Sequence, residues 1–188
     1  MDDEKKDHIL SAALELFFRY GYRRVSMEEI AQAADMSRQG LYLYFRTKKD
    51  VYIAAVQRRA EILLAEIHEG MTGEMTVEEK LMYAFELWTI RDYDAEIGSP
   101  EAREIYAYTQ PFMAASFDTT RRRFEAVVTA TLVDHFAGKD SRPPFEEQTI
   151  AHLIYSSMRG LKLSASSAHE LRGMIQNLLR LIIGTSGR

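Results

Sequence analysis

Arg38 and Gln39 are adjacent side chains with a specific kind of hydrogen-bonding chemistry. Arginine can bind the edge of guanine, and glutamine the edge of adenine, through a pair of hydrogen bonds. Both follow Ser37, a residue type that often caps the first turn of a helix, and Leu41 is spaced to face inward on that helix. We therefore interpret Arg38 and Gln39 as residues that read DNA bases from the exposed first turn of a short helix.

A second short helix is predicted directly before this one. Ser26 and Glu29 have the spacing of a capping box, in which each side chain binds the backbone amide of the other residue. The apolar residues that follow share one helical face: Met27, Ile30, Ala31 and Ala34. Asp35 tolerates a left-handed backbone, so the chain can turn sharply after this helix. Two helices joined by so tight a turn form a helix-turn-helix, which places its second helix in the major groove of DNA.

The same segment resembles the DNA-binding domain of the tetracycline-repressor (TetR) family. The residues that carry the resemblance are in register: Gly21-Tyr22, Ser26-Met27, Ile30-Ala31, Ala34, Met36-Ser37, Leu41-Tyr42, Tyr44-Phe45 and Lys48 to Val51. Asp35 departs from the pattern, because the family usually has glycine there. The resemblance implies that Tyr42 and Lys48 hold DNA phosphates. Phosphate contacts fix the register of a protein on DNA, and base contacts specify the sequence.

The predicted DNA-binding residues are Ser26, Ser37, Arg38, Gln39, Gly40, Tyr42, Tyr44 and Lys48. Tyr42 has an alternative interpretation as a half-buried core residue. The direction of Tyr44, toward the core or toward the groove, stays open at this stage. Thr47 is expected to cap a helix that begins at Lys48.

The charge of the chain is unevenly distributed. The net charge is −4, yet residues 19–49 contain seven Lys or Arg and three Asp or Glu. A basic segment on an acidic protein is typical of a local nucleic-acid footprint that avoids indiscriminate binding. Taken alone, the asymmetry also fits charges that only cover solvated faces.

The sequence predicts an all-α protein with two domains. A helix-turn-helix DNA-binding domain of three helices occupies residues 1–47, and a helical effector-binding and dimerisation domain occupies residues 48–188. A long helix from Lys48 to His68 joins them and is our candidate lever. The other helices expected in the second domain are Thr76 to Arg91, Glu101 to Thr109, Met113 to Phe136, Phe145 to Ala165 and His169 to Ile183. The sequence contains no alternating strand pattern.

Aromatic residues are concentrated in the second domain, where nine of the twenty lie between positions 83 and 124. Apolar pockets between helices are a usual form of small-molecule site. We expect an apolar or aromatic ligand to contact Tyr83, Trp88, Tyr106, Tyr108, Phe112 and Phe117. For any single one of these side chains, ordinary core packing is the simpler interpretation.

The last two predicted helices are more apolar than one buried face requires, so part of each is expected to meet a partner. The resemblance implies that they pair with their copies in a four-helix bundle. The predicted dimerisation residues are Leu153, Ser157, Leu161, Met174, Leu178 and Ile182. A two-fold dimer would present two recognition helices to a near-palindromic operator.

Several classes of function are disfavoured by the sequence. It has no cysteine, and its five histidines lack metal-ligand spacing, so no metal site is expected. It also lacks a nucleophile motif and a glycine-rich phosphate loop, so we expect neither an enzyme nor a cofactor. With no signal-peptide pattern and no long apolar run, we expect a cytoplasmic protein without a membrane partner.

These observations predict a ligand-responsive transcriptional regulator, most simply a repressor, that binds double-stranded operator DNA as a homodimer and responds to an unknown small molecule. One alternative is an architectural DNA-binding protein without a small-molecule effector. A second alternative is an enzyme on a helical scaffold, which the missing catalytic constellation disfavours.

Overall fold

The computed structural model describes residues 2–139 and 143–184, apart from the side chains of residues 103, 106–108, 110 and 111. All regular structure in these residues is helical, which confirms the all-α class. The elements are α1 (Asp2–Tyr20), α2 (Met27–Ala33), α3 (Arg38–Tyr44), α4 (Lys48–Gly70), α5 (Val77–Phe85), η1 (Glu86–Ile90), α6 (Tyr93–Gly98), α7 (Pro100–Phe136), α8 (Glu147–Ser164) and α9 (Ala168–Ile183). No helix in this part of the chain is long and apolar enough to cross a membrane.

The chain folds into two compact units. The first, called the reader unit below, contains residues 1–62 and 98–118. The second, called the body unit, contains residues 63–97 and 119–188. Helices α4 and α7 therefore each contribute residues to both units.

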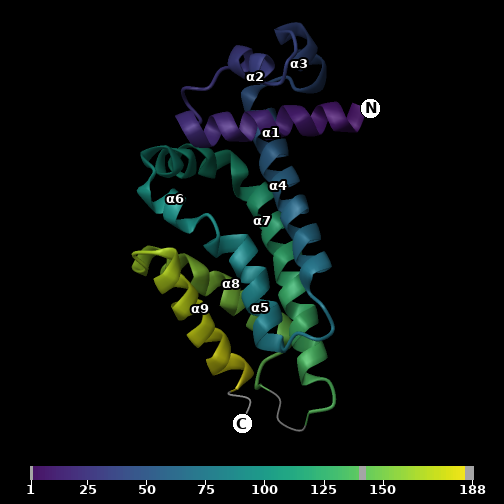
Figure 1. Ribbon diagram of the computed structural model, residues 1–188, viewed down its shortest axis with the longest axis vertical. Coiled ribbons are helices and arrows are strands. Elements are labelled where there is room, and N and C mark those ends of the chain that lie inside the picture. The colour runs from purple at the N-terminus through teal and green to yellow at the C-terminus, as the bar shows by residue number, and fades with distance from the viewer. Residues whose placement is uncertain (1, 140–142, 185–188) are drawn as a thin grey trace. The chain divides into compact units, whose positions relative to one another are not determined.

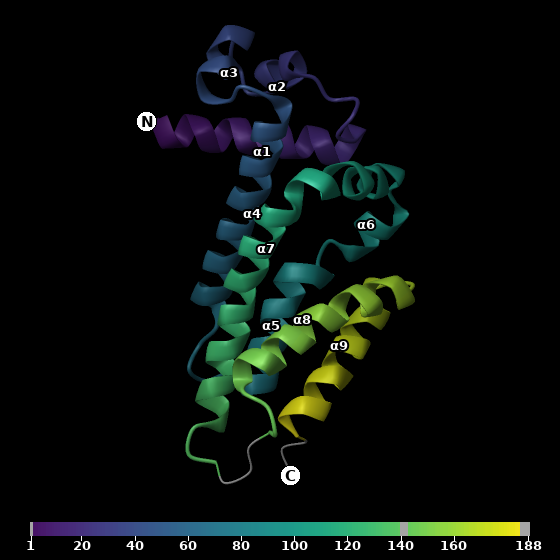
Figure 2. The same cartoon turned by 180° about the vertical axis from the view of Figure 1, so that it is seen from behind.

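The reader unit contains the predicted helix-turn-helix. Ser26 caps α2 in a complete capping box with Glu29, and Ser37 caps α3 by accepting a hydrogen bond from the Gly40 amide. Asp35 has a φ of +51°, the left-handed conformation expected for the turn between these helices. In Figures 1 and 2, α2 and α3 lie side by side, and α1 crosses next to them. These cap and turn predictions are confirmed.

Gly21 follows the last residue of α1 with a left-handed φ of +82°, a conformation that favours glycine. Its amide donates to the Phe17 carbonyl at 2.9 Å. The core of the reader unit is formed by α1 to α4 together with part of α7. Its buried residues are Ile9, Leu10, Ala13, Phe17, Val25, Met27, Ile30, Ala31, Ala34, Leu41, Phe45, Val51, Tyr52, Ala55, Ile105 and Met113.

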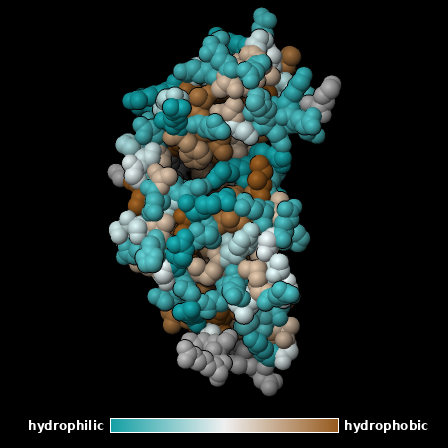
Figure 3. All heavy atoms as spheres, viewed as in Figure 1, coloured by the Kyte–Doolittle hydropathy of each residue, from teal (hydrophilic) through white to brown (hydrophobic). Residues whose placement is uncertain are grey.

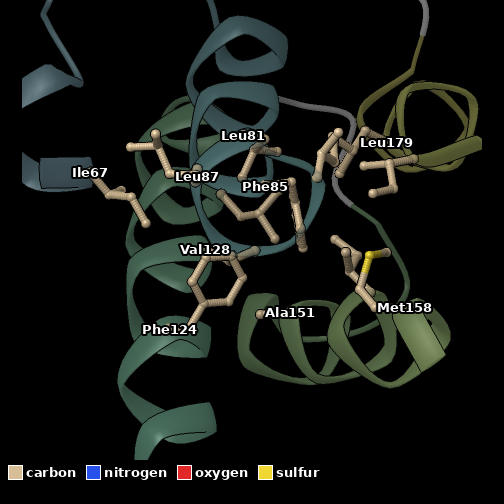
Figure 4. Close-up of a cluster of buried hydrophobic side chains, with 14 of the residues drawn as sticks. Ile67, Leu81, Phe85, Leu87, Phe124, Val128, Ala151, Met158 and Leu179 are labelled. Carbon is tan, nitrogen blue, oxygen red and sulfur yellow. The ribbon is translucent and has the colours of Figure 1, made fainter. Parts of the chain in front are cut away.

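The body unit has its own core, in which helices α5, α7, α8 and α9 contribute most of the side chains. Figure 4 shows Phe124 of α7 near Phe85 of α5, with Met158 of α8 and Leu179 of α9 in the same cluster. The rings of Phe85 and Phe124 pack edge to face, with centroids 5.1 Å apart.

Three expected helices differ from the structure. The helix expected over 76–91 is α-helical only through Phe85, and a π-helix follows in which the Arg91 amide donates to the Glu86 carbonyl. The two helices expected on either side of residue 111 are one helix, α7. A proline inside a helix removes one backbone hydrogen bond. Ile105 and Met113, on either side of the proline, are both buried in the core of the reader unit.

Candidate nucleic-acid interface

Helix α3 has one buried face and one exposed face. Leu41 and the following Phe45 are buried, whereas Arg38, Gln39 and Tyr42 are exposed. On the face of the molecule shown in Figure 3, the surface is mostly hydrophilic, with scattered hydrophobic residues. A short helix anchored by two apolar residues, with Arg38 and Gln39 exposed, can be inserted into a groove without unfolding its core.

The guanidinium of Arg38 is held on the protein surface by two neighbours. Its Nε lies 4.0 Å from a carboxylate oxygen of Glu28, and its Cζ lies 5.6 Å from the ring centroid of Tyr42. A hydrogen bond with Tyr42 raises the pKa of Arg38, so the guanidinium stays charged. Since the side chain is 60% exposed, it can leave Glu28 for a guanine edge at little cost.

Ser26 and Ser37, two of the predicted DNA contacts, both serve as helix caps. The Ser26 hydroxyl donates to Glu29 Oε2 at 2.7 Å and accepts from the Glu29 amide, so both of its hydrogen-bonding roles are used. The Ser37 oxygen accepts from the Gly40 amide at 3.0 Å, which leaves its hydrogen available to donate. A Cβ at Gly40 would lie 3.3 Å from that oxygen, so a small residue keeps the cap uncrowded.

Tyr44 contacts α1. Its hydroxyl donates to Asp2 Oδ1 at 2.9 Å, and this hydrogen bond raises the pKa of the phenol. The structure therefore places the hydroxyl of Tyr44 against the first turn of α1 in the free protein. A DNA contact by Tyr44 stays a prediction.

The ammonium group of Lys48 is directed into the protein. Its Nζ donates to the carbonyls of Tyr22, Arg23 and Val25 at 2.7, 3.1 and 2.6 Å. It also lies 4.7 Å from the centroid of the Tyr22 ring. Partial burial lowers the pKa of Lys48. An ammonium has three hydrogens, and all three are used here, so the phosphate contact implied by the family resemblance stays a prediction.

The loop between α1 and α2 is also fixed by α7. Glu104 Oε1 accepts a hydrogen bond from the Arg23 amide at 3.1 Å, and the other carboxylate oxygen would lie 2.9 Å from a Cβ at Gly21. The ring of Phe112 lies 5.5 Å from that of Tyr22. Sequence reasoning missed these contacts because they join residues about eighty positions apart.

The six predicted ligand-binding residues do not all lie in one unit. Tyr83 and Trp88 belong to the body unit, and Phe112 and Phe117 to the reader unit. The Trp88 ring stacks on Phe124 with centroids 4.5 Å apart. The side chains of Tyr106 and Tyr108 lie outside the described residues. Packing against the hydrophobic core of each unit therefore accounts for the described members, and their role toward a ligand stays a prediction.

A groove of about 380 Å³ lies in the reader unit between α1 and α4. It is lined by Asp3, Lys6, Asp7, Leu10, Ala54, Gln57, Arg58 and Glu61. Arg58 Nη2 forms an ion pair with Asp7 across it. Its charged lining differs from the apolar pocket expected for the ligand.

The predicted dimerisation residues lie on α8 and α9 at several depths. Leu153 is 51% exposed and Ser157 is exposed, while the others are half-buried: Leu161, Met174, Leu178 and Ile182. Two leucines outside the predicted set of dimerisation residues, Leu163 and Leu181, are more than four-fifths exposed on the same two helices.

Leu43 is a residue of α3 that sequence reasoning missed. Its side chain is 87% exposed on the helix predicted to enter the groove. The helical period alone predicts the exposure of Leu43, because position 43 lies nearly opposite the inward-facing Leu41.

Known proteins resemble this chain in two ways. Residues 9–55 match the family described as "Bacterial regulatory proteins, tetR family". The transcriptional activator FasR of Mycolicibacterium smegmatis is 32% identical over 84 residues, which are 45% of this chain and 38% of FasR. The chain thus spans well under two thirds of that relative's length.

Solved structures share the fold over nearly the whole chain. The fatty acid degradation regulator FadR of Bacillus halodurans aligns with a TM-score of 0.70 and 18% identity, covering 98% of this chain and 97% of that one. FadR of Thermus thermophilus, a TetR-family repressor solved in complex with lauroyl-CoA, aligns with a TM-score of 0.66 and 17% identity, covering 97% and 96%. At these identities the likeness establishes the fold alone.

Proposed function

The chain belongs to the TetR family of helix-turn-helix transcriptional regulators, and from this premise we propose that it represses transcription. In this proposal a homodimer binds a near-palindromic operator and is released by a small apolar or aromatic ligand. The observation that carries the proposal is the outward face of α3, which presents Arg38 and Gln39 beside a buried Leu41. These are the side-chain types that discriminate guanine and adenine in the major groove.

The surfaces of α8 and α9 support the homodimer. Leu163 and Leu181 are exposed leucines on these helices. A Cβ at Gly160 or Gly173 would meet no atom within 4 Å, so packing within the chain does not require glycine at either position. Small residues on helices that also carry exposed leucines allow a second copy to approach closely and to bury apolar surface.

The aromatic residues of the body unit support an apolar ligand. Tyr155, Trp88 and Phe124 are in contact there, and burial raises the pKa of the Tyr155 phenol. The lauroyl-CoA bound to Thermus thermophilus FadR supplies a concrete probe of the right chemistry. We infer that a ligand with an apolar chain inserts among these helices and shifts the dimer away from its DNA-binding state, which requires a coupling of about 1–3 kcal/mol.

The proposal is tested by selecting bound duplexes from a random DNA pool with the purified full chain. The expected product is one inverted repeat whose half-sites are spaced by roughly 34 Å or a multiple of that distance. The Gln39→Ala variant tests the reading role of α3, because it changes an exposed residue that the fold does not need. That variant should lose preference at one base pair of each half-site.

The selected duplex then serves to test ligand release. Fluorescence anisotropy of the protein–DNA complex is measured while lauroyl-CoA or free coenzyme A is added. Release by the acylated compound and not by coenzyme A supports an apolar effector. Selection of many unrelated sequences with no release by any ligand would overturn the proposal in favour of an architectural DNA-binding protein.

A further inference from the structure

The face of α3 directly opposite its buried side is formed by Gln39 and Leu43. With about 100° per residue, they lie about 160° and 200° around the helix from Leu41. Leu41 itself is fully buried. Arg38 and Tyr42 lie nearer the buried side, about 60° and 100° from Leu41 on the same scale. The centre of the outward face therefore combines one amide side chain and one purely apolar side chain.

Leu43 has no packing role in the reader unit, because 87% of its surface is exposed. A single exposed leucine is common on protein surfaces and indicates nothing by itself. The position of this leucine is informative, because it lies one turn after Gln39 on the helix that the proposed function inserts into DNA. The surrounding residues 19–49 carry four more basic than acidic side chains, which complements the phosphate backbone.

We propose that Leu43 is a specificity-determining residue that recognises thymine by packing against its 5-methyl group in the major groove. A leucine side chain has no hydrogen-bonding atom, so it gains most from an apolar group on a base edge. Among the four bases, only thymine presents such a group in the major groove. The inference rests on the proposed function, and it adds the identity of a base that the operator must contain.

The helix geometry also sets where this thymine lies. Four residues of α-helix rise about 6 Å, and successive base pairs are about 3.4 Å apart along DNA. The thymine bound by Leu43 therefore lies within about two base pairs of the base read by Gln39. Because glutamine prefers adenine, each half-site should contain an adenine and a thymine at this short separation.

The test replaces one thymine at a time in the selected operator by deoxyuridine, in both half-sites together. This change removes only the methyl group and keeps base pairing. For the wild-type protein, deoxyuridine at one of these positions should lower the affinity for DNA by about fourfold per half-site. This is the factor expected when one buried carbon group is removed from an apolar contact. At that position Leu43→Ala should bind thymine and uracil duplexes equally, while Gln39→Ala should keep the preference for thymine.

The outcomes distinguish this inference from the proposed function. Leu43→Ala should have the melting temperature of the wild-type protein, because the side chain of Leu43 is exposed. This measurement shows that the fold of the variant is intact. The role of Leu43 would be overturned if the protein binds its operator specifically and no replacement of thymine by deoxyuridine lowers the affinity. It would also be overturned if Leu43→Ala still prefers thymine to deoxyuridine at the position where the wild-type protein does. Either result would leave the regulator proposal standing. If the wild-type protein selects no sequence at all, the proposed function fails, and the thymine contact fails with it.

Discussion

The ammonium nitrogen of Lys48 lies 2.6 Å from the carbonyl oxygen of Val25, the second-last residue before α2. The same nitrogen binds the carbonyls of Tyr22 and Arg23. One side chain at the start of α4 thus holds the loop that precedes α2. This loop fixes where the helix-turn-helix begins, so Lys48 stabilises the placement of α2 and α3 relative to α4.

Replacing Lys48 by methionine separates this internal role from a phosphate contact. Hydrogen bonds to a charged group contribute about 1.5–3 kcal/mol, so Lys48→Met should lower the free energy of unfolding by roughly that amount. If Lys48 acts only inside the protein, DNA affinity should fall for all sequences while its dependence on salt stays the same. A phosphate-binding lysine would instead reduce the salt slope by about one ion per site.

Lys49→Met is the matched control, because it removes the same charge from the adjacent, exposed position. It should leave the denaturation midpoint almost unchanged. If Lys48→Met keeps the stability of the wild-type protein and its DNA affinity depends less steeply on salt, the lysine contacts DNA and its internal hydrogen bonds do not stabilise the fold.

Replacing Arg38 by alanine should relax the preference for one base pair in each half-site. A bidentate arginine–guanine contact contributes about 1–3 kcal/mol of discrimination, so the affinity difference between guanine and the other bases at that position should disappear. Titrations of four operators that differ at this base pair measure the effect. An equal loss for all four operators would show that Arg38 contacts the backbone and reads no base.

Replacing Leu181 by glutamate should separate the dimer. The leucine is 83% exposed in the single chain, so the fold should tolerate the change. In a two-fold interface the residue occurs twice, and burying one leucine contributes about 1.5–3 kcal/mol, so the dissociation constant of the dimer should rise roughly a hundredfold or more. Sedimentation velocity at several concentrations measures it.

Val133→Glu is the control for the dimer prediction, because Val133 is a half-exposed apolar residue on α7. It introduces the same charge on a different helix. A dimer that persists in Leu181→Glu and dissociates in Val133→Glu would move the interface to α7.

The capping box of α2 should make stability depend on acid. Hydrogen bonds from the Ser26 side chain and backbone amide hold the pKa of Glu29 below its ordinary value of 4.5. A carboxyl whose pKa is lower in the folded state stabilises the fold above its unfolded pKa, and this contribution is lost as the pH falls through the folded pKa. Wild type should therefore melt at a higher temperature than Glu29→Gln at pH 7.

The difference between the two melting temperatures should shrink progressively below pH 4.5 as Glu29 becomes protonated. Calorimetry of both proteins from pH 7 to pH 3 follows it. A difference that stays constant over this range would mean that the charge of Glu29 does not contribute to the capping box.

The helix-turn-helix was predictable because its signals are local. Ser26 and Glu29 are three residues apart, and Asp35 takes up the left-handed backbone that its residue type allows. Such signals depend on neighbouring residues, so the sequence alone contains them. The exposure of Arg38 and Gln39 followed from the same helical period that buried Leu41.

The contacts between distant segments were not predictable in this way. Nothing near Lys48 in the sequence indicates that its ammonium binds Tyr22 and Val25, and nothing near Glu104 indicates the Arg23 amide. These partners are brought together only by packing of α4 and α7 against the first helices. The sequence predicts two helices where the structure has the single helix α7, because a proline disfavours helix in the residues around it.

The most direct test of the account is a fluorescence-anisotropy titration of the purified protein against the DNA upstream of its own gene, at physiological salt with an unrelated duplex as competitor. We expect binding at roughly nanomolar concentration, with two protein chains per site, that survives the competitor and is weakened in Gln39→Ala. Weak binding that the unrelated duplex abolishes, equal for wild type and Gln39→Ala, would contradict the claim that α3 reads sequence.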